Sequence, residues 1–401
     1  MDALTTPLPK AWQRVRLGDI CEFGNGGAYE TLIVENGNFK LISLNSIDID
    51  GNLKNTMKRV NFYDNSLKQD DIVMVLSDVA HGDFLGLCAV IPNNDYVLNQ
   101  RMGRLRKKND CINILFLRLY INANQKYFKM QGQGSSQLNL SKKAIEDFEI
   151  LLPPLNEQIA IANVLSDVDR YLYSLDALIL KKESVKKALS FELLSQRKRL
   201  KGFNQAWQRV RLGDICEIVK GQQINKISLN NTDKYPVING GIDFLGYTNK
   251  FNVSKNTIAI SEGGTCGYVR FMKSDFWSGG HNYSLQKISN KVNNLCLYHI
   301  LKSYEKDIMK LGVGSGLKNI QLKALKDFEI LLPPLNEQAA IANILSALDS
   351  EIISLKNKKR QFENIKKALN HDLMSTKIRV LKNKTPQKSR TNPLIRKPLS
   401  F

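Results

Sequence analysis

The most regular pattern of hydrophobic and polar positions occurs in two long stretches, each beginning just after a pair of prolines. In both stretches apolar residues recur at alternating steps of four and three. In the first stretch these are Ile161, Leu165, Val168, Leu172, Leu175, Ile179, Leu189 and Leu193. In the second they are Ile341, Leu345, Leu348, Ile352, Leu355, Phe362, Leu369 and Leu373. This heptad spacing predicts two long helices that pair through an apolar seam.

Flanking residues indicate where these helices begin and end. The pairs Pro153-Pro154 and Pro333-Pro334 cannot lie inside a helix, so they set the earliest starts. Asn156 and Asn336 are candidate N-caps, and Gly202 is a candidate stop for the first helix. We therefore expect two spacer helices, over residues 156–201 and 336–381.

Four lysines interrupt the seam, and their role has two interpretations. They either lie on its solvated edge or fix an antiparallel register between the helices. Val185 and Ile365 sit one position from the seam, so we expect them to carry the packing there. The four lysines are Lys182, Lys186, Lys359 and Lys366.

A second pattern, of short apolar runs, predicts strands ahead of each helix. Runs rich in β-branched residues, such as 71–76 (DIVMVL) and 256–260 (NTIAI), are separated by Gly, Asn and Asp turns. A glycine-bearing loop follows each set, at 132–141 and at 312–321. The predicted fold class is therefore α+β.

The chain also contains two sequences that are each repeated without a change. The leader repeat, AWQRVRLGDICE, occupies 11–22 and 206–217, and the proline repeat, DFEILLPPLNEQ, occupies 147–158 and 327–338. The leader alternates apolar residues from Trp12 to Ile20, which predicts a strand. The segments enclosed by the repeats show no evident similarity to each other. We infer two copies of one scaffold that present two different surfaces.

Connection lengths then predict the arrangement of the two copies. The first helix leads directly into the second copy, and the second helix buries its seam most simply by returning antiparallel. Two globular domains are thus expected at opposite ends of a long antiparallel coiled coil, with internal pseudo-twofold symmetry. They would lie more than one turn of B-DNA (~34 Å) apart. The expected domains are 1–155 and 202–335, and residues 382–401 form a basic tail.

Charge narrows the class of partner. The formal net charge is +20 and the pI is about 9.6, which indicates a polyanion, most commonly nucleic acid. Residues 1–10 lack the apolar core of a signal peptide, and no apolar stretch of the sequence is long enough to span a bilayer. We therefore expect a cytoplasmic protein with no membrane contact. Six cysteines without a CxxC pair, and four histidines, predict buried free thiols and no metal site.

Motifs for catalysis are absent from the sequence. The segment 241–248 (GIDFLGYT) has tyrosine where a phosphate-binding loop needs lysine. The segment 152–155 (LPPL) has leucine in place of the polar and aromatic residues with which amino-methyltransferases bind their target base. We therefore predict a chain that is not an enzyme, with no catalytic residue, no metal and no cofactor of its own.

The two leader repeats and the two proline repeats, each of which heads a heptad helix, resemble the specificity subunit of type I restriction–modification enzymes. The resemblance covers residues 11–381. It implies that each enclosed segment is a target-recognition domain, which recognises one half of a bipartite, asymmetric site in double-stranded DNA. It also implies docking of two methyltransferase subunits, and through them of restriction (motor-nuclease) subunits. S-adenosylmethionine, ATP and Mg would belong to those partners.

Two alternatives remain open. One is the recognition subunit of another multisubunit restriction system, whose partner is a fused methyltransferase–nuclease. The other is a stand-alone DNA-modifying enzyme.

Candidate DNA contacts are polar residues near predicted turns, which could equally be solvated loop residues. In the first enclosed segment these are Ser77, His81, Asn99, Gln100, Arg101 and Arg104. In the second they are Asn239, Lys250, Arg270, His281, Asn282 and Lys318. The outer helix faces and the proline repeats are the expected methyltransferase docking surface, because identical sequence suits identical partners.

Overall fold

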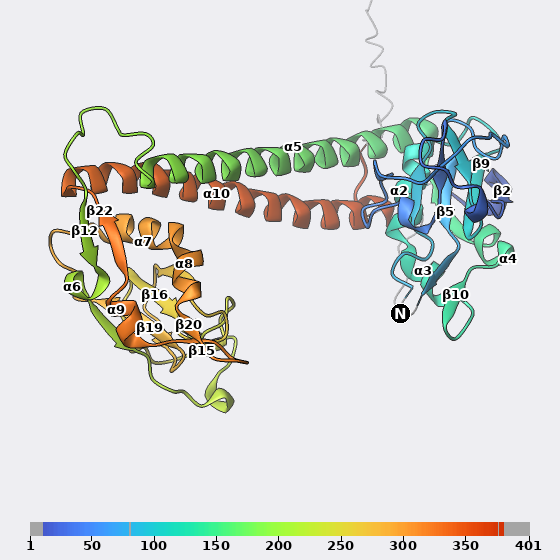
Figure 1. Cartoon of the computed structure of the whole chain (residues 1–401). Coiled ribbons are helices and arrows are strands. Elements are labelled where there is room, and N and C mark those ends of the chain that lie inside the picture. The colour runs from blue at the N-terminus through green and yellow to red at the C-terminus, as the bar shows by residue number, and fades with distance from the viewer. Residues whose placement is uncertain (1–10, 80–81, 376, 381–401) are drawn as a thin grey trace, which may run out of the picture. The chain divides into compact units, whose positions relative to one another are not determined.

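The computed structural model describes residues 11–79, 82–375 and 377–380, and it separates into two compact units. Unit 1 is Met1–Tyr173 with Arg360–Phe401, and unit 2 is Ser174–Lys359. Each unit holds one α/β domain and part of both long helices, α5 (Leu155–Leu194) and α10 (Leu335–Met374) (Figure 1). These units cut across the expected division into separate domains and helices. The expected tail, 382–401, and the segment 1–10 lie outside the described residues.

The domain of unit 1 is built on two sheets and a strand pair. The four-stranded antiparallel sheet has the order β2-β9-β5-β7, and a three-stranded sheet has the order β4-β3-β8, with β3 parallel to β8. The strands β1 and β11 pair with each other. The bounds are β1 Gln13–Arg16, β2 Cys21–Asn25, β3 Phe39–Ile42, β4 Arg59–Val60, β5 Ile72–Val75, β7 Cys88–Val90, β8 Tyr96–Leu98, β9 Met102–Lys107 and β11 Glu149–Leu152.

The domain of unit 2 repeats every one of these pairings. Its sheets have the orders β13-β19-β16-β17 and β15-β14-β18, with β14 parallel to β18, and β12 pairs with β22. Two segments without evident sequence similarity therefore adopt one topology. The bounds are β12 Gln208–Arg211, β13 Glu217–Lys220, β14 Tyr235–Ile238, β15 Gly246–Thr248, β16 Thr257–Ser261, β17 Val269–Met272, β18 Trp277–Ser278, β19 Asn282–Gln286 and β22 Glu329–Leu332.

Short helices cover one face of each larger sheet. In unit 1, α2 (Ile114–Ala123) packs against β7 and buries Phe116 and Leu117; in unit 2, α7 (Asn294–Ser303) packs against β17 and buries Leu297. The side chains of Asn113 and Asn293 cap these two helices in the same way. The other short helices are α1 Leu17–Ile20, α3 Gln125–Gln131, α4 Lys142–Glu146, α6 Leu212–Ile215, α8 Glu305–Lys310 and α9 Leu322–Lys326.

The strands predicted from apolar runs are present, whereas the leader repeat differs from its prediction. The predicted runs 71–76 and 256–260 are confirmed as strands β5 and β16. The leader repeat was expected to be a strand throughout, but the strand stops at Arg16 or Arg211 and a one-turn helix follows. That turn buries Leu17 and Ile20, since an extended chain would point only one of such a pair toward the core.

The glycine-bearing loops form β-hairpins. In unit 1, Gln133 bridges to Asn139 across the turn, and β10 (Gln137–Asn139) also pairs with the sequence-distant strand β6 (Ser77–Val79). In unit 2, β20 (Gly312–Val313) pairs with β21 (Asn319–Ile320). Gly134 and Gly314 have φ values of 125° and 132°, which side-chain-bearing residues rarely adopt.

The long helices start one residue earlier and end sooner than expected. The carbonyl of Pro154 accepts from the backbone N–H groups of Glu157 and Gln158, so Asn156 lies in the first turn and is not the N-cap. The first helix ends at Leu194, well before Gly202. Gln196, with φ 62°, turns the chain there, and the N–H of Lys198 donates to the carbonyl of Glu192.

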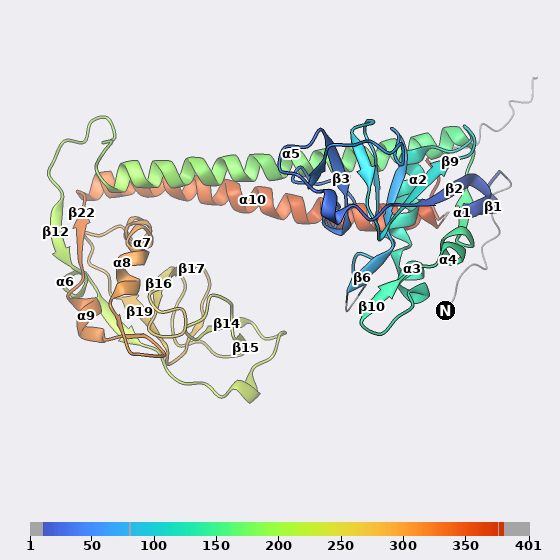
Figure 2. The ribbon, with the colours of Figure 1, turned by 45° about the vertical axis from the view of Figure 1, so that its right-hand side comes forward.

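Within each unit, α5 and α10 run side by side and antiparallel (Figures 1 and 2). In unit 1 the ring of Tyr171 packs on that of Phe362. All four seam lysines make ion pairs across the helix pair: Lys366–Asp169 at 2.5 Å, Lys359–Asp176 at 2.7 Å, Lys182–Glu351 at 2.8 Å, and Lys186–Asp349. This observation supports the interpretation in which the lysines fix the register.

The expectation that Val185 and Ile365 pack in the seam was wrong. Their side chains are 45% and 49% exposed. The neighbouring Lys186 and Lys366 occupy the seam instead, each with a carboxylate partner on the opposite helix. A lysine stem can cover apolar surface while its charged end reaches such a partner.

Acid is expected to destabilise unit 2 through His299. This α7 side chain is 4% exposed, and burial lowers its pKa from the ordinary value of 6.5 to about 4. The unfolded chain therefore binds a proton that the folded unit rejects. Stability is full above pH 6.5 and falls as the pH drops toward 4, by up to about 3 kcal/mol.

A variant separates this effect from general acid denaturation. Leu119 lies at the same position of unit 1 and is also buried. His299→Leu should therefore flatten the pH dependence of the urea midpoint between pH 6.5 and 4. An unchanged slope in the variant would contradict the assignment to His299.

Candidate nucleic-acid interface

Each unit is closed by a buried carboxylate at the start of one long helix. In unit 1 the indole N–H of Trp12 donates to Glu157 at 3.1 Å, and Arg379 donates two hydrogen bonds to the same carboxylate, at 2.9 and 2.5 Å. In unit 2, Glu337 accepts from Trp207 at 3.1 Å and from Arg199 at 2.8 Å twice. We call these trios the carboxylate latches.

The latches tie each domain to both long helices. Glu157 and Glu337 are each 1% exposed, so their charges need the arginine partners. Arg379 follows α10 but closes unit 1, and Arg199 follows α5 but closes unit 2. These arginines were not predicted from the sequence. The signal was present, because each helix is followed by a serine (Ser195, Ser375) with the arginine four residues later.

The glutamines of the proline repeats fasten the helix starts to the domains. The side-chain oxygen of Gln158 accepts from the N–H of Asn113 at 2.8 Å, and its amide donates to the carbonyl of Pro153 at 2.8 Å. Gln338 makes the equivalent bonds to Asn293 at 2.6 Å and to Pro333 at 2.7 Å. The Glu-Gln part of the repeat is therefore internal, and only neighbours such as Leu155 and Leu335 face outward.

Three of the predicted DNA contacts are buried and already have partners inside the domains. Ser77 donates to the side-chain oxygen of Asn139 at 2.6 Å. Asn99 accepts from the N–H of Tyr29 at 3.1 Å and donates to Glu30 at 2.9 Å. Asn282 accepts from the N–H of Gly240 at 3.2 Å. The structure thus places these three side chains away from the surface that DNA could reach.

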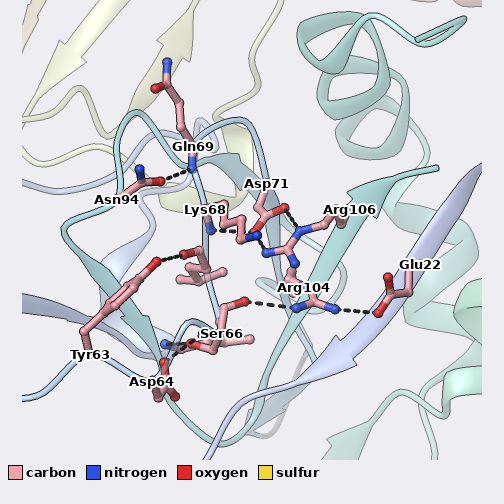
Figure 3. A network of polar contacts seen from close by, with 12 residues as sticks. Glu22, Tyr63, Asp64, Ser66, Lys68, Gln69, Asp71, Asn94, Arg104 and Arg106 are labelled. Atoms are coloured by element: carbon pink, nitrogen blue, oxygen red, sulfur yellow. Dashed lines mark hydrogen bonds and ion pairs between the residues drawn. The ribbon is translucent and has the colours of Figure 1, made fainter. Parts of the chain in front are cut away.

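Arg104 belongs to a polar network along β9 (Figure 3). Its guanidinium donates to Glu22 at 2.8 Å and to the carbonyl of Ser66 at 3.2 Å. Arg106, next along the same face, makes two bonds of 2.8 and 2.6 Å to the buried Asp71. Arg104 is only 14% exposed, so its geometry supports a role in holding the sheet and its loops together.

Gln100 and Arg101 form an exposed turn between β8 and β9. Hydrogen bonds from Gln100 and Asn99, with the charge of Arg101, hold the pKa of Glu30 below its usual value. Arg101 itself is exposed and has a φ of 66°, an uncommon conformation for a residue other than glycine. His81 lies outside the described residues.

The predicted DNA contacts of unit 2 also divide into side chains that have partners inside the domain and side chains that are exposed. Arg270 donates to the carbonyls of Gly241, at 2.9 Å, and Ile242, and it stacks over the rings of Phe244 and Tyr268. Burial lowers the pKa of Arg270. Asn239 is partly buried and accepts from the N–H of His281 at 3.1 Å. Lys250, His281 and Lys318 are exposed.

Of the candidates that lie among the described residues, Arg101 is exposed in unit 1, and Lys250, His281 and Lys318 are exposed in unit 2. Gln100 is partly exposed and its side chain bonds to Glu30.

No cluster that could ligate a metal occurs among the described residues, where at least three His, Cys, Asp or Glu side chains would have to converge. The six cysteines are free thiols, but Cys111 is exposed and Cys266 is partly exposed, so the expectation of burial holds for only four of them. Within the described part of the chain, no helix is long and apolar enough to cross a bilayer.

Comparisons with known proteins agree on one family. The model of the type I restriction modification DNA specificity domain matches residues 9–182 and 204–364. The specificity subunit of the type I restriction enzyme MjaVIII from Methanocaldococcus jannaschii is 26% identical over 411 residues, covering 93% of this chain and 94% of that protein. A candidate type I specificity subunit of Mycoplasma pneumoniae is 39% identical over 151 residues, but the match spans only 40% of its length.

A solved structure shows the same fold. The crystal structure of the S subunit of a type I restriction-modification system from M. genitalium aligns with a TM-score of 0.70 at 18% identity, covering 93% of this chain and 99% of that one. Another, described as showing complex assembly and conformational transition of a type I system, aligns with a TM-score of 0.54 at 16% identity.

Proposed function

Because this chain belongs to the type I restriction–modification DNA specificity family, we propose that it is the subunit through which such a complex recognises a bipartite, asymmetric DNA site. One observation carries the proposal. Two domains whose larger sheets have the same strand order carry different exposed side chains in the same turn, Arg101 in unit 1 and His281 in unit 2. A scaffold used twice with different contact residues suits two different half-sites.

The helix pair supports recognition of two halves across an unspecified gap. We propose that α5 and α10 form one antiparallel coiled coil, with the two domains at opposite ends and related by a pseudo-twofold axis. The latches, the glutamine contacts and the pairs Lys186–Asp349 and Lys366–Asp169 occur at the same positions of both repeats. Equivalent contacts in both units are what such an axis requires.

The charge supports binding to the DNA backbone. With a net charge of +20, the chain can neutralise phosphates and release counterions. Lys250 and Lys318 are exposed on unit 2 and suit phosphate contacts, which position a protein without specifying sequence.

We further propose that two methyltransferase subunits dock on the long helices, and that restriction subunits join through them. Exposed apolar residues recur at the same positions of both repeats, as docking of two identical partners requires. These pairs are Leu155 with Leu335, Tyr173 with Ile353, and Val185 with Ile365. The partners would supply S-adenosylmethionine, ATP and Mg, while this chain supplies recognition without catalysis, in the cytoplasm.

The test is methylation-sensitive sequencing of host DNA with and without this gene. We expect the gene to be required for methylation at a site with two specified parts around an unspecified gap. As a control, exchanging residues 218–326 for the matching segment of a relative should change one part and preserve the other. A single continuous motif, or methylation that persists without the gene, would refute the proposal.

A further inference from the structure

Each domain contains a junction of three chain segments. The two junctions correspond residue by residue, so they align the two domains. In unit 1 the N–H of Leu76 donates to the carbonyl of Arg101 at 3.0 Å, and the N–H of Leu140 donates to the carbonyl of Leu76 at 2.8 Å. In unit 2 the N–H of Glu262 donates to the carbonyl of His281 at 2.8 Å, and the N–H of Ile320 donates to the backbone carbonyl of Glu262 at 2.9 Å. Arg101 and His281 therefore occupy equivalent positions.

The residues next to this junction are also equivalent. Ser77 follows Leu76 and Gly263 follows Glu262, while Asn139 precedes Leu140 and Asn319 precedes Ile320. Asn139 and Asn319 stand at the same distance before the two proline repeats, which supports the alignment independently. Each hairpin thus presents an exposed asparagine beside a position that differs between the units.

The differing residues set the surroundings of each asparagine. In unit 1 the Ser77 hydroxyl donates to the side-chain oxygen of Asn139 at 2.6 Å. In unit 2 Gly263 has no side chain, and a Cβ there would lie 2.3 Å from the side-chain oxygen of Asn319 and 3.8 Å from Nδ1 of His281. The missing side chain therefore leaves room for the Asn319 amide close to the His281 ring.

We propose that Arg101 and His281 are equivalent specificity-determining residues, each recognising a base edge in its own half-site beside a shared asparagine. This inference rests on the proposed function and assigns its residues. Arg101 fits guanine, whose O6 and N7 accept two parallel bonds from a guanidinium, whereas an imidazole offers one bond at a time. The asparagine is the same in both units, and the residue beside it differs. Equivalent junctions can therefore recognise two different half-sites.

The experiment uses the full-length chain with its methyltransferase subunits, and it determines the methylated motif for the wild type, Arg101→Ala, Arg101→Lys and His281→Ala. Arg101→Ala should lower discrimination about tenfold to a hundredfold at one guanine of one half-site. Arg101→Lys should lose the same discrimination, since lysine keeps the charge but not the two parallel bonds. His281→Ala should relax one position of the other half-site only.

The untouched half-site is the internal control for folding in every variant. A different result would overturn the proposal: Arg101→Ala weakens methylation at all sites equally or abolishes it, and Arg101→Lys restores it. Arg101 would then contact a phosphate. An unchanged motif would overturn it as well. A wild-type chain that directs no bipartite methylation would instead refute the proposed function, so the two failures are distinguishable.

Discussion

Residues 1–202 expressed alone are expected to form a twofold homodimer that, with methyltransferase, specifies an inverted repeat of one half-site. The truncated chain keeps the domain of unit 1 but lacks the end of α10, which closes that unit. The groups it loses are Leu369, Leu373, Met374, Arg379 and Val380, all of which pack in unit 1 or pair with Glu157. A second copy can replace them, because the same positions of α5 hold Leu189, Leu193, Leu194, Arg199 and Leu200.

The charges that would face each other in this dimer decide its strength. Arg199 of one copy can pair with Glu157 of the other, and Lys186 with Asp169, as their equivalents do in the intact chain. Glu183, which pairs with Lys356 in the intact chain, would instead meet Asp176. The dimer should therefore form less tightly than the intact helix pair, since each such like-charge contact opposes pairing.

Sedimentation measures the dimer, and sequencing of methylated DNA identifies its target. Arg199→Ala in the truncated chain should shift the equilibrium toward monomer, because it removes both new latches at once. Two results would contradict the equivalence of the two units. One is that the unsubstituted fragment 1–202 is a folded monomer in sedimentation, and the other is that its dimer still directs methylation to the asymmetric site.

Replacing Arg379 with alanine is expected to destabilise unit 1 by about 3–5 kcal/mol, the typical cost of leaving a buried charge unpaired. The Glu157 carboxylate is 1% exposed and, among the described side chains that donate to it, would keep only Trp12. Urea unfolding followed by tryptophan fluorescence measures the change, with Trp12 reporting from the latch of unit 1 and Trp207 and Trp277 reporting from unit 2. Arg199→Ala should have the equivalent effect on unit 2.

A matched control is available in the same unit. Arg14 pairs with Glu149 at 2.7 Å, but both side chains are about half exposed. Arg14→Ala should therefore cost less than about 1 kcal/mol. Equal losses for Arg379→Ala and Arg14→Ala would show that burial of Glu157 does not determine the energy of the latch.

The candidate contacts illustrate how far sequence reasoning reached. Asn99, Gln100 and Arg101 are consecutive and polar, so sequence alone gave no reason to separate them. In the fold, Asn99 points inward to Tyr29 and Glu30, whereas Arg101 faces solvent. Asn139 and Asn319 were not among the candidates, because only the junction with β6 and with Gly263 places them beside Arg101 and His281.

The sequence by itself determined the repeated scaffold, the two long helices, the basic charge and the family, because repeats, heptads and composition are properties of residues close together along the chain. Only the tertiary structure decided which polar residues are buried and how the units are closed. Arg379 meets Glu157 across 222 residues, and such a contact depends on segments that no local pattern relates. Burial then gives these residues structural roles and leaves a few side chains exposed, among them Arg101 and His281, for which we propose contacts with DNA.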